Sequence, residues 1–138
     1  MRIMGLDYGD SRIGVALSDE FGWTASPLCV VESKRGKKKA LNELKRLIAD
    51  NSVDTVVVGY PLNMDGSEGI RTDVTNQFVF SLEAAMPSVN VIKWDERLTT
   101  VAADRAMREM GIKQRAKGMN DVLAAVFILQ GYLDSKRS

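Results

Sequence analysis

The chain has 138 residues, 45% of them hydrophobic, and its 19 basic and 18 acidic side chains nearly balance. This length fits one compact domain over residues 1–138, and the balance of charge gives no overall electrostatic signal for a partner. The sequence contains no histidine. A Ser-His-Asp triad, a Cys-His pair and a His-ligated zinc site are therefore excluded, and any catalysis would use carboxylates, lysines, hydroxyls or a metal ion.

The cellular compartment is indicated by the cysteine content and by the first residues of the chain. A single cysteine, Cys29, excludes an internal disulfide framework and fits a reducing cytosol. The chain has no apolar run of about 18 residues, as a membrane span would need. Its first residues, MRIMGLD, read as the start of a strand and not as a signal peptide. We therefore expect a cytoplasmic protein that does not contact a membrane.

Three strands are expected at the start of the chain. Apolar segments over 2–9 and 12–19 are separated by a short polar turn, and a third segment covers 23–33. Pro27 in the third segment indicates an edge position or a bulge. Because the connections are short, these strands should form an antiparallel meander.

Helices and strands then alternate along the chain. Apolar residues at helical spacing predict helices, and short Val-rich or Ile-containing runs predict strands. In chain order these are a helix over 37–51, a strand over 54–62, a helix over 71–86, a strand over 89–96 and helices over 100–111 and 120–133. Strands joined by helices run parallel. The order β β β α β α β α α thus predicts an α/β fold, a five-stranded mixed sheet with helices on both faces.

Three carboxylates fall where such a fold binds ligands, at the carboxyl ends of parallel strands. Asp7 ends the first strand, and Asp95 and Glu96 end the last. Side chains alternate along a strand, so only one of Asp95 and Glu96 can easily join Asp7. Asp121, in the first turn of the last helix, lies on a largely apolar side of that helix and is expected to point toward the sheet.

Carboxylates that lie close together repel one another unless they are protonated or bound to a metal ion. Because imidazole and thiolate ligands are missing, oxygen ligands would favour Mg²⁺ or Mn²⁺, and two such ions can promote phosphodiester hydrolysis. Structural roles stay open for each acid: a turn cap at Asp7 and a helix-dipole partner at Asp121. Asp95 could pair with Arg97.

Basic and polar residues near these strand ends could contact a nucleic acid. The run of cations from Lys34 to Lys39 precedes a helix, where positive charge opposes the helix dipole, so it is either a phosphate contact or a solvated loop. Arg12 could contact phosphate or pair with Asp10 or Asp19. The nucleic-acid-binding candidates are Arg12, Asn63, Arg71, Arg97, Lys113, Arg115 and Lys117. We expect Trp23 and Trp94 to pack in the core or at its edge.

Four segments also resemble the motif blocks of a known family in order and spacing. They are GLDYGDSRIGVALSD, VVVGYPLNMDGSEG, WDERLTT and KGMNDVLAAVFIL. They resemble those of the YqgF family, also called RuvX or the Holliday junction resolvase-like family, and the resemblance extends over essentially the whole chain. It implies a ribonuclease H-like fold and a role in maturation of the 5′ end of pre-16S ribosomal RNA.

The resemblance also implies site residues. The acidic triad of the family falls on Asp7, Glu96 and Asp121, which would be the catalytic residues and the ligands of Mg²⁺ or Mn²⁺. The family's KG dipeptide falls on Lys117 and Gly118. One difference separates this chain from better-studied ribonuclease H enzymes, which carry an acid near the middle of the fold. Here the sequence at that point is GYPLN, so Glu96 would substitute from another strand.

Together these features predict a metal-dependent nuclease, a hydrolase that leaves a 3′-hydroxyl and a 5′-phosphate. Its partner would be pre-16S rRNA or a ribosomal precursor particle, and it would act as a monomer or homodimer in ribosome biogenesis. Three alternatives remain: a resolvase of branched DNA, a non-catalytic RNA-binding assembly factor, and an ATP-binding protein of the actin and sugar-kinase type. The last class needs two such domains to enclose a nucleotide.

Overall fold

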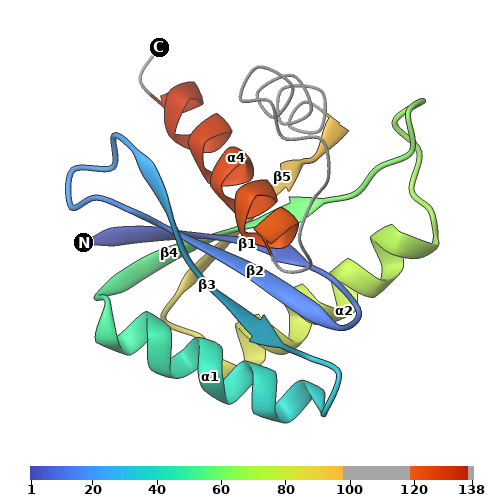
Figure 1. Ribbon diagram of the computed structural model, residues 1–138. Helices are drawn as coiled ribbons and strands as arrows, with labels where there is room; N and C mark the ends of the chain where they lie inside the picture. The colour runs from blue at the N-terminus through green and yellow to red at the C-terminus, as the bar shows by residue number, and fades with distance from the viewer. Residues whose placement is uncertain (98–118, 137–138) are drawn as a thin grey trace.

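A five-stranded mixed sheet forms the centre of the protein in the computed structural model, which describes residues 1–97 and 119–136. The strands are arranged in the order β3-β2-β1-β4-β5 (Figure 1). Their bounds are β1 Arg2–Tyr8, β2 Arg12–Ser18, β3 Ala25–Glu32, β4 Val53–Tyr60 and β5 Asn90–Asp95. β1, β4 and β5 are parallel, while β2 and β3 continue the sheet antiparallel from β1, which confirms the predicted topology.

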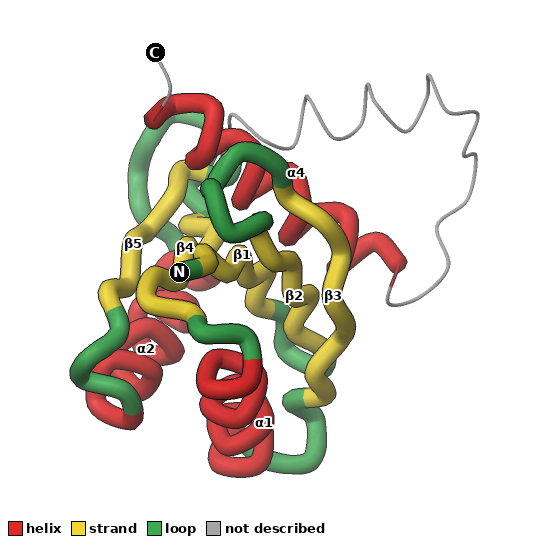
Figure 2. Tube along the Cα trace, turned by 90° about the vertical axis from the view of Figure 1, so that its left-hand side faces the viewer, coloured by secondary structure: helices red, strands yellow, loops and turns green. Residues whose placement is uncertain are grey.

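Helices cover both faces of this sheet. α1 (Lys37–Asp50) and α2 (Ile70–Ala85) lie on one face, and α4 (Met119–Lys136) lies on the other (Figures 1 and 2). The helix expected over 100–111 lies outside the described residues. Within the described part of the chain, no helix is long and apolar enough to cross a membrane.

The alternation of side chains along the strands builds a separate core on each face. Met4 and Leu6 of β1 pack in one cluster with Leu44 of α1 and Phe78 of α2. Val57 of β4 belongs to the second cluster, which it forms with residues of α4 such as Ala125, Ile128 and Leu129. α2 buries Thr72 and Thr75 together with Phe78, because the Thr72 hydroxyl donates to the carbonyl of Pro61 at 2.6 Å.

Small residues let α4 lie very close to the sheet. A Cβ added to Gly5 of β1 would lie 2.7 Å from the Cβ of Leu129, closer than side chains can pack. At the sheet edge, Pro27 of β3 pairs with Ala16, directly beside a register shift between Val15 and Ala16. Both the edge position and the bulge predicted from Pro27 are therefore confirmed.

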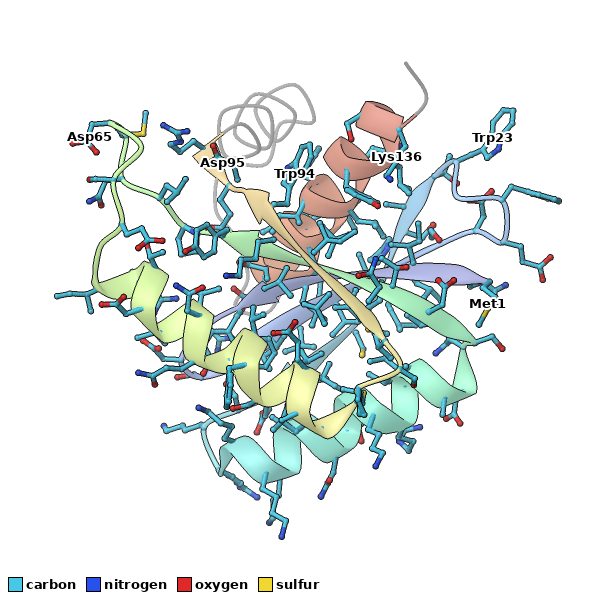
Figure 3. All side chains as sticks on the ribbon, turned by 180° about the vertical axis from the view of Figure 1, so that it is seen from behind. Met1, Trp23, Asp65, Trp94, Asp95 and Lys136 are labelled. Carbon is cyan, nitrogen blue, oxygen red and sulfur yellow. The ribbon has the colours of Figure 1, made fainter. Side chains whose placement is uncertain are left out.

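The two tryptophans differ in their surroundings. Trp94 of β5 lies between the sheet and α4, and its ring meets that of Tyr132 edge to face, with centroids 6.2 Å apart (Figure 3). Trp23 is 60% exposed, so the expectation that it packs in the core is wrong. It lies in the connection between β2 and β3, where Gly22 has φ 72° and the Asp19 carboxylate accepts a hydrogen bond from the Trp23 N–H at 2.7 Å. These turn contacts leave the indole in solvent.

Candidate active site

Asp7 lies at the carboxyl end of β1, on the α4 face, between glycines of the two neighbouring strands. Gly14 of β2 is its register partner, and Gly59 of β4 follows the Leu6–Val58 pair. A Cβ at position 59 would lie 2.5 Å from Oε1 of Glu96, and a Cβ at position 14 would overlap the carbonyl oxygen of Asp121. The missing side chains therefore leave the space in which two other acidic residues approach Asp7.

Glu96, and not Asp95, is the acid of the last strand that joins Asp7. The Glu96 N–H donates to the Tyr60 carbonyl at 3.1 Å, so the chain continues past β5 beside β4. Glu96 lies two residues after Trp94, which packs toward α4, so its side chain faces the same side of the sheet. Asp95 is instead bound by Arg97, whose Nη2 lies 2.7 Å from Oδ2 and whose Nε lies 3.1 Å from both carboxylate oxygens.

Asp7 and Glu96 form a buried, hydrogen-bonded pair of carboxyl groups. Burial raises the pKa of Asp7 to about 8, with the negative charge of Glu96, the hydrogen bond to it and the charge of Asp121 acting in the same direction. Burial also raises the pKa of Glu96, although its hydrogen bond with Asp7 and the charge of Arg71 oppose the rise. At neutral pH the pair thus keeps a proton, which the two carboxyl groups share in their hydrogen bond.

Asp121 lies close to this pair but is bound by a cation. Its Oδ2 accepts a hydrogen bond from Nε of Arg12 at 3.1 Å. The expectation that Arg12 pairs with Asp10 or Asp19 is therefore wrong, because the close approach of α4 to Gly14 brings Asp121 to the start of β2. Asp121 faces the sheet, as expected from its helical position, and its charge reaches Asp7.

The carboxyl pair suits a hard divalent cation. Two buried carboxyl groups that share a proton offer only oxygen donors, which Mg²⁺ and Mn²⁺ prefer, and a cation would replace the proton. Within residues 1–97 and 119–136, no group of three acids is arranged to hold a metal ion. The donor chemistry of Asp7 and Glu96 fits such an ion, whereas the third predicted ligand, Asp121, is engaged with Arg12.

Arg71 of α2 lies beside the carboxyl pair. Its Nη1 donates to Oδ1 of Asp10 at 3.0 Å and its Nη2 to the carbonyl of Tyr8 at 3.3 Å. Its positive charge lowers the pKa of both Asp7 and Glu96. Among the described candidates for nucleic-acid contact, Arg71 is thus placed where its charge acts on both acids of the pair.

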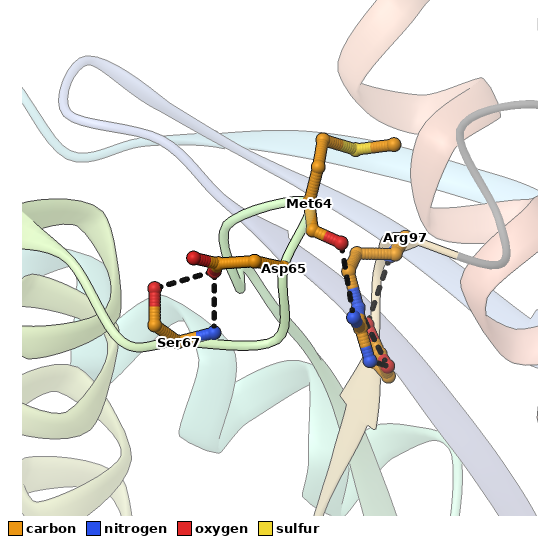
Figure 4. A network of polar contacts seen from close by, with 5 residues as sticks. Met64, Asp65, Ser67 and Arg97 are labelled. Carbon is orange, nitrogen blue, oxygen red and sulfur yellow. Dashed lines mark hydrogen bonds and ion pairs between the residues drawn. The ribbon is translucent and has the colours of Figure 1, made fainter.

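Asn63 and Arg97, two further candidates for nucleic-acid contact, make hydrogen bonds within or to the loop between β4 and α2. Asn63 Nδ2 donates to Oγ of Ser67 at 3.0 Å. Arg97 reaches across to the carbonyl of Met64 at 3.4 Å, and Asp65 accepts from both the N–H and the hydroxyl of Ser67 (Figure 4). Nucleic-acid contacts of Asn63 and Arg97 stay predictions, and Lys113, Arg115 and Lys117 lie outside the described residues.

Two features of the site were missed from the sequence. Gly59 reads only as the end of a strand, whereas the structure shows that it makes room for Glu96. The sequence suggests Asp10 only as a possible partner of Arg12, yet it pairs with Arg71. The role of Gly59 could have been inferred from its location, because it lies near the end of a strand that runs beside the strand preceding Glu96. Asp10 offered no comparable signal, because its partner is distant in the chain.

A family model and two relatives match nearly the whole chain. The family model described as RuvX: Holliday junction resolvase matches residues 1–135. A protein of Ruminiclostridium cellulolyticum named "Putative pre-16S rRNA nuclease" is 53% identical over 135 residues, covering 97% of this chain and 94% of the relative. A protein of the same name from Acetivibrio thermocellus is 51% identical over 137 residues, covering 99% of this chain and 97% of the relative.

A solved structure shows the same fold at low sequence identity. Thermus thermophilus RuvC in complex with a Holliday junction substrate matches with a TM-score of 0.64 and 15% identity, over 99% of this chain and 96% of that one. This match confirms the ribonuclease H-like fold and carries no information about the substrate of the present chain.

Proposed function

Because this chain belongs to the RuvX family, we propose that it is a metal-dependent nuclease that processes pre-16S ribosomal RNA. The names of relatives that are 42–53% identical and match nearly the full chain support a nuclease of this substrate class. The divalent ion, the cut position and the RNA substrate of this chain belong to the proposal.

The carboxyl pair of Asp7 and Glu96 is the observation that carries the proposal. Two acids, one in β1 and one directly after β5, are buried side by side, although neither stabilises the fold when both are charged. Such an arrangement is typical of sites that bind a cation. Asp7 and Glu96 would hold Mg²⁺ or Mn²⁺, with Asp121 as the third ligand.

The chain's own residues would bind and orient the substrate. When bound, a pair of such ions would supply activation of the attacking water and stabilisation of the leaving oxygen. Asp7 releases its proton on metal binding and becomes a charged ligand. Arg71 and Arg12, on either side of the pair, would neutralise the charge of the scissile and neighbouring phosphates. Lys113, Arg115 and Lys117 are further proposed phosphate contacts.

One cleavage assay tests the proposal. Purified protein with Mn²⁺ is offered pre-16S RNA and a four-way DNA junction side by side, with labels at either RNA end to distinguish internal cuts from stepwise removal. We expect cleavage of the RNA and its loss in Asp7→Asn and Glu96→Gln. Full activity of Asp7→Asn would overturn the assignment of the site.

Holliday junction resolution is the second candidate, favoured by the description of the matching family model. Cleavage of the junction with the RNA left intact would select it. A non-catalytic assembly factor would cut neither substrate and would bind RNA without a Mn²⁺ requirement. Calorimetry with ATP tests the kinase-like alternative, for which we expect no binding.

A further inference from the structure

Arg12 occupies a position from which it can reach both the acidic site and a bound phosphate. It is the first residue of β2, and its side chain lies on the α4 face of the sheet, the face on which Gly14 leaves room for Asp121. Gly14 in turn pairs with Asp7. The guanidinium is bonded to Asp121 at 3.1 Å, yet the Arg12 side chain stays 36% exposed and that of Asp121 27% exposed.

This ion pair conflicts with metal binding by the same carboxylate. While Arg12 is bonded to Asp121, that carboxylate is engaged with a cation and is not available as a ligand for a divalent ion near Asp7. The Asp121 charge already acts on Asp7, so the two groups are close, and among the described residues it is the Arg12 guanidinium that binds Asp121. A guanidinium also binds phosphate with two parallel hydrogen bonds, which makes a phosphate a good substitute for the Asp121 carboxylate.

We propose that Arg12 is a positioning residue that couples nucleic-acid binding to metal binding through Asp121. Without nucleic acid, Arg12 holds Asp121 away from Asp7 and Glu96. A backbone phosphate that takes over the guanidinium releases Asp121 to these two acids. The inference rests on the proposed function, because it uses the metal site proposed there. Since coupling is reciprocal, the metal also favours phosphate binding by Arg12.

The alternative role for Arg12 is structural. The ion pair joins the start of β2 to the first turn of α4, and on this view it would only hold the helix in place. Arg71 offers a matched control, because it is a second arginine at the same site whose partner, Asp10, is 76% exposed and is not a proposed metal ligand. The Arg71 charge acts on Asp7 directly, whereas Arg12 is bonded to Asp121, so only loss of Arg12 frees that carboxylate.

The first experiment measures Mn²⁺ affinity by calorimetry without nucleic acid. The proteins are the wild type, Arg12→Gln, Asp121→Asn, the double variant of these two, Arg71→Gln with and without Asp121→Asn, and Asp7→Asn. We expect Arg12→Gln to tighten Mn²⁺ binding roughly tenfold, in the range of typical coupling between sites. The same change should have no effect when Asp121 is already Asn, whereas any gain from Arg71→Gln should persist in that background.

The outcomes separate this inference from the proposed function. If the wild type and Arg12→Gln bind Mn²⁺ equally, or if the gain persists with Asp121→Asn, the coupling is refuted while the metal site stands. If no variant binds Mn²⁺, or if Asp7→Asn binds it as the wild type does, the metal site is refuted as well. Arg12→Lys keeps the charge and should retain the affinity of the wild type, so tighter binding by this variant also counts against the coupling.

A second measurement follows the same coupling from the nucleic-acid side and does not depend on Arg12→Gln alone. Binding of a short single-stranded RNA is followed by fluorescence anisotropy in EDTA. We expect Asp121→Asn to bind the RNA several-fold more tightly than the wild type, because Arg12 is free for a phosphate. If the Arg12 guanidinium contacts the phosphate, this gain should disappear when Asp121→Asn is combined with Arg12→Lys or with Arg12→Gln. A gain that persists in both double variants would overturn the proposal.

Discussion

The buried carboxyl pair predicts that Asp7→Asn stabilises the metal-free protein. The substitution keeps the shape of the side chain and removes the group whose charge is disfavoured by burial and by Glu96. An asparagine at this position can still donate a hydrogen bond to the Glu96 carboxylate. The expected sign is unusual for a proposed catalytic residue, because most substitutions of buried residues destabilise a protein.

The magnitude follows from the pKa of Asp7, which is about 8 in the folded protein against an ordinary value of 3.8. The folded pKa is thus about four above the ordinary value, and at about 1.4 kcal/mol for each pKa unit this sets an upper limit of about 6 kcal/mol above pH 8. Glu96 keeps its own burial cost in the variant, so we expect a gain of about 1–3 kcal/mol, or several degrees in Tm.

The pH dependence has a defined direction. The unfolded chain loses the Asp7 proton near pH 4, whereas the folded protein keeps it up to about pH 8. Wild-type stability attributable to this group is therefore complete below pH 4 and falls as the pH rises through that window. The advantage of Asp7→Asn should be small at pH 4, grow through neutral pH and level off above pH 8.

Urea unfolding in EDTA at pH 5 and pH 8 measures this difference, with Asp10→Asn as a control that changes an exposed acid three residues along the chain. The reasoning is refuted if Asp7→Asn is less stable than the wild type at pH 8, or if the difference does not depend on pH. With Mn²⁺ in place of EDTA, the wild type should gain stability and the variant should not, because an ion that binds the folded site stabilises the folded state.

Three further predictions test the surroundings of the pair. Gly14→Ala should destabilise the fold by about 3 kcal/mol or more in urea unfolding, because its Cβ meets backbone of α4 that has no space to move. An unchanged midpoint would contradict the close approach. Gly59→Ala should cost only about 1–2 kcal/mol, since it meets the ends of the Glu96 and Ile128 side chains, but it should weaken Mn²⁺ binding in calorimetry. Binding as tight as in the wild type would show that Glu96 is not needed. Phe78→Ala should lose about 3–5 kcal/mol in thermal unfolding, because the ring is 1% exposed and stacks on Tyr8 at 4.2 Å. A loss below about 1 kcal/mol would contradict this packing.

Much of the fold could be predicted because burial leaves a local pattern in the sequence. The Val-rich run of β4 and the helical spacing of Leu44, Leu47 and Ile48 report which side chains are buried without any knowledge of their partners. The parallel order of β1, β4 and β5 then follows from the helices that connect them. The location of Asp7 and Glu96 at one sheet edge follows from the same rule.

The pairing of charged side chains could not be predicted in the same way. Arg12 and Asp121 are separated by 109 positions, and their contact depends on how closely α4 approaches Gly14. The choice between Asp95 and Glu96 depends on which face of β5 packs on α4, although the apolar ring of Trp94 two residues before Glu96 carried that information. Trp23 was misplaced because turn contacts at Asp19, and not hydrophobicity, determine its exposure.

The arrangement of Asp7 and Glu96 has a consequence for the order of events during synthesis of the chain. Asp7 is made among the first residues, but its partner follows β5, the last strand of the sheet. Because β5 pairs with β4, the two acids meet only after the chain beyond Glu96 has been made and the final strand has paired. In a growing chain the two carboxylates therefore do not yet repel each other and cannot act together. The proposed site forms only when β5 has paired with β4.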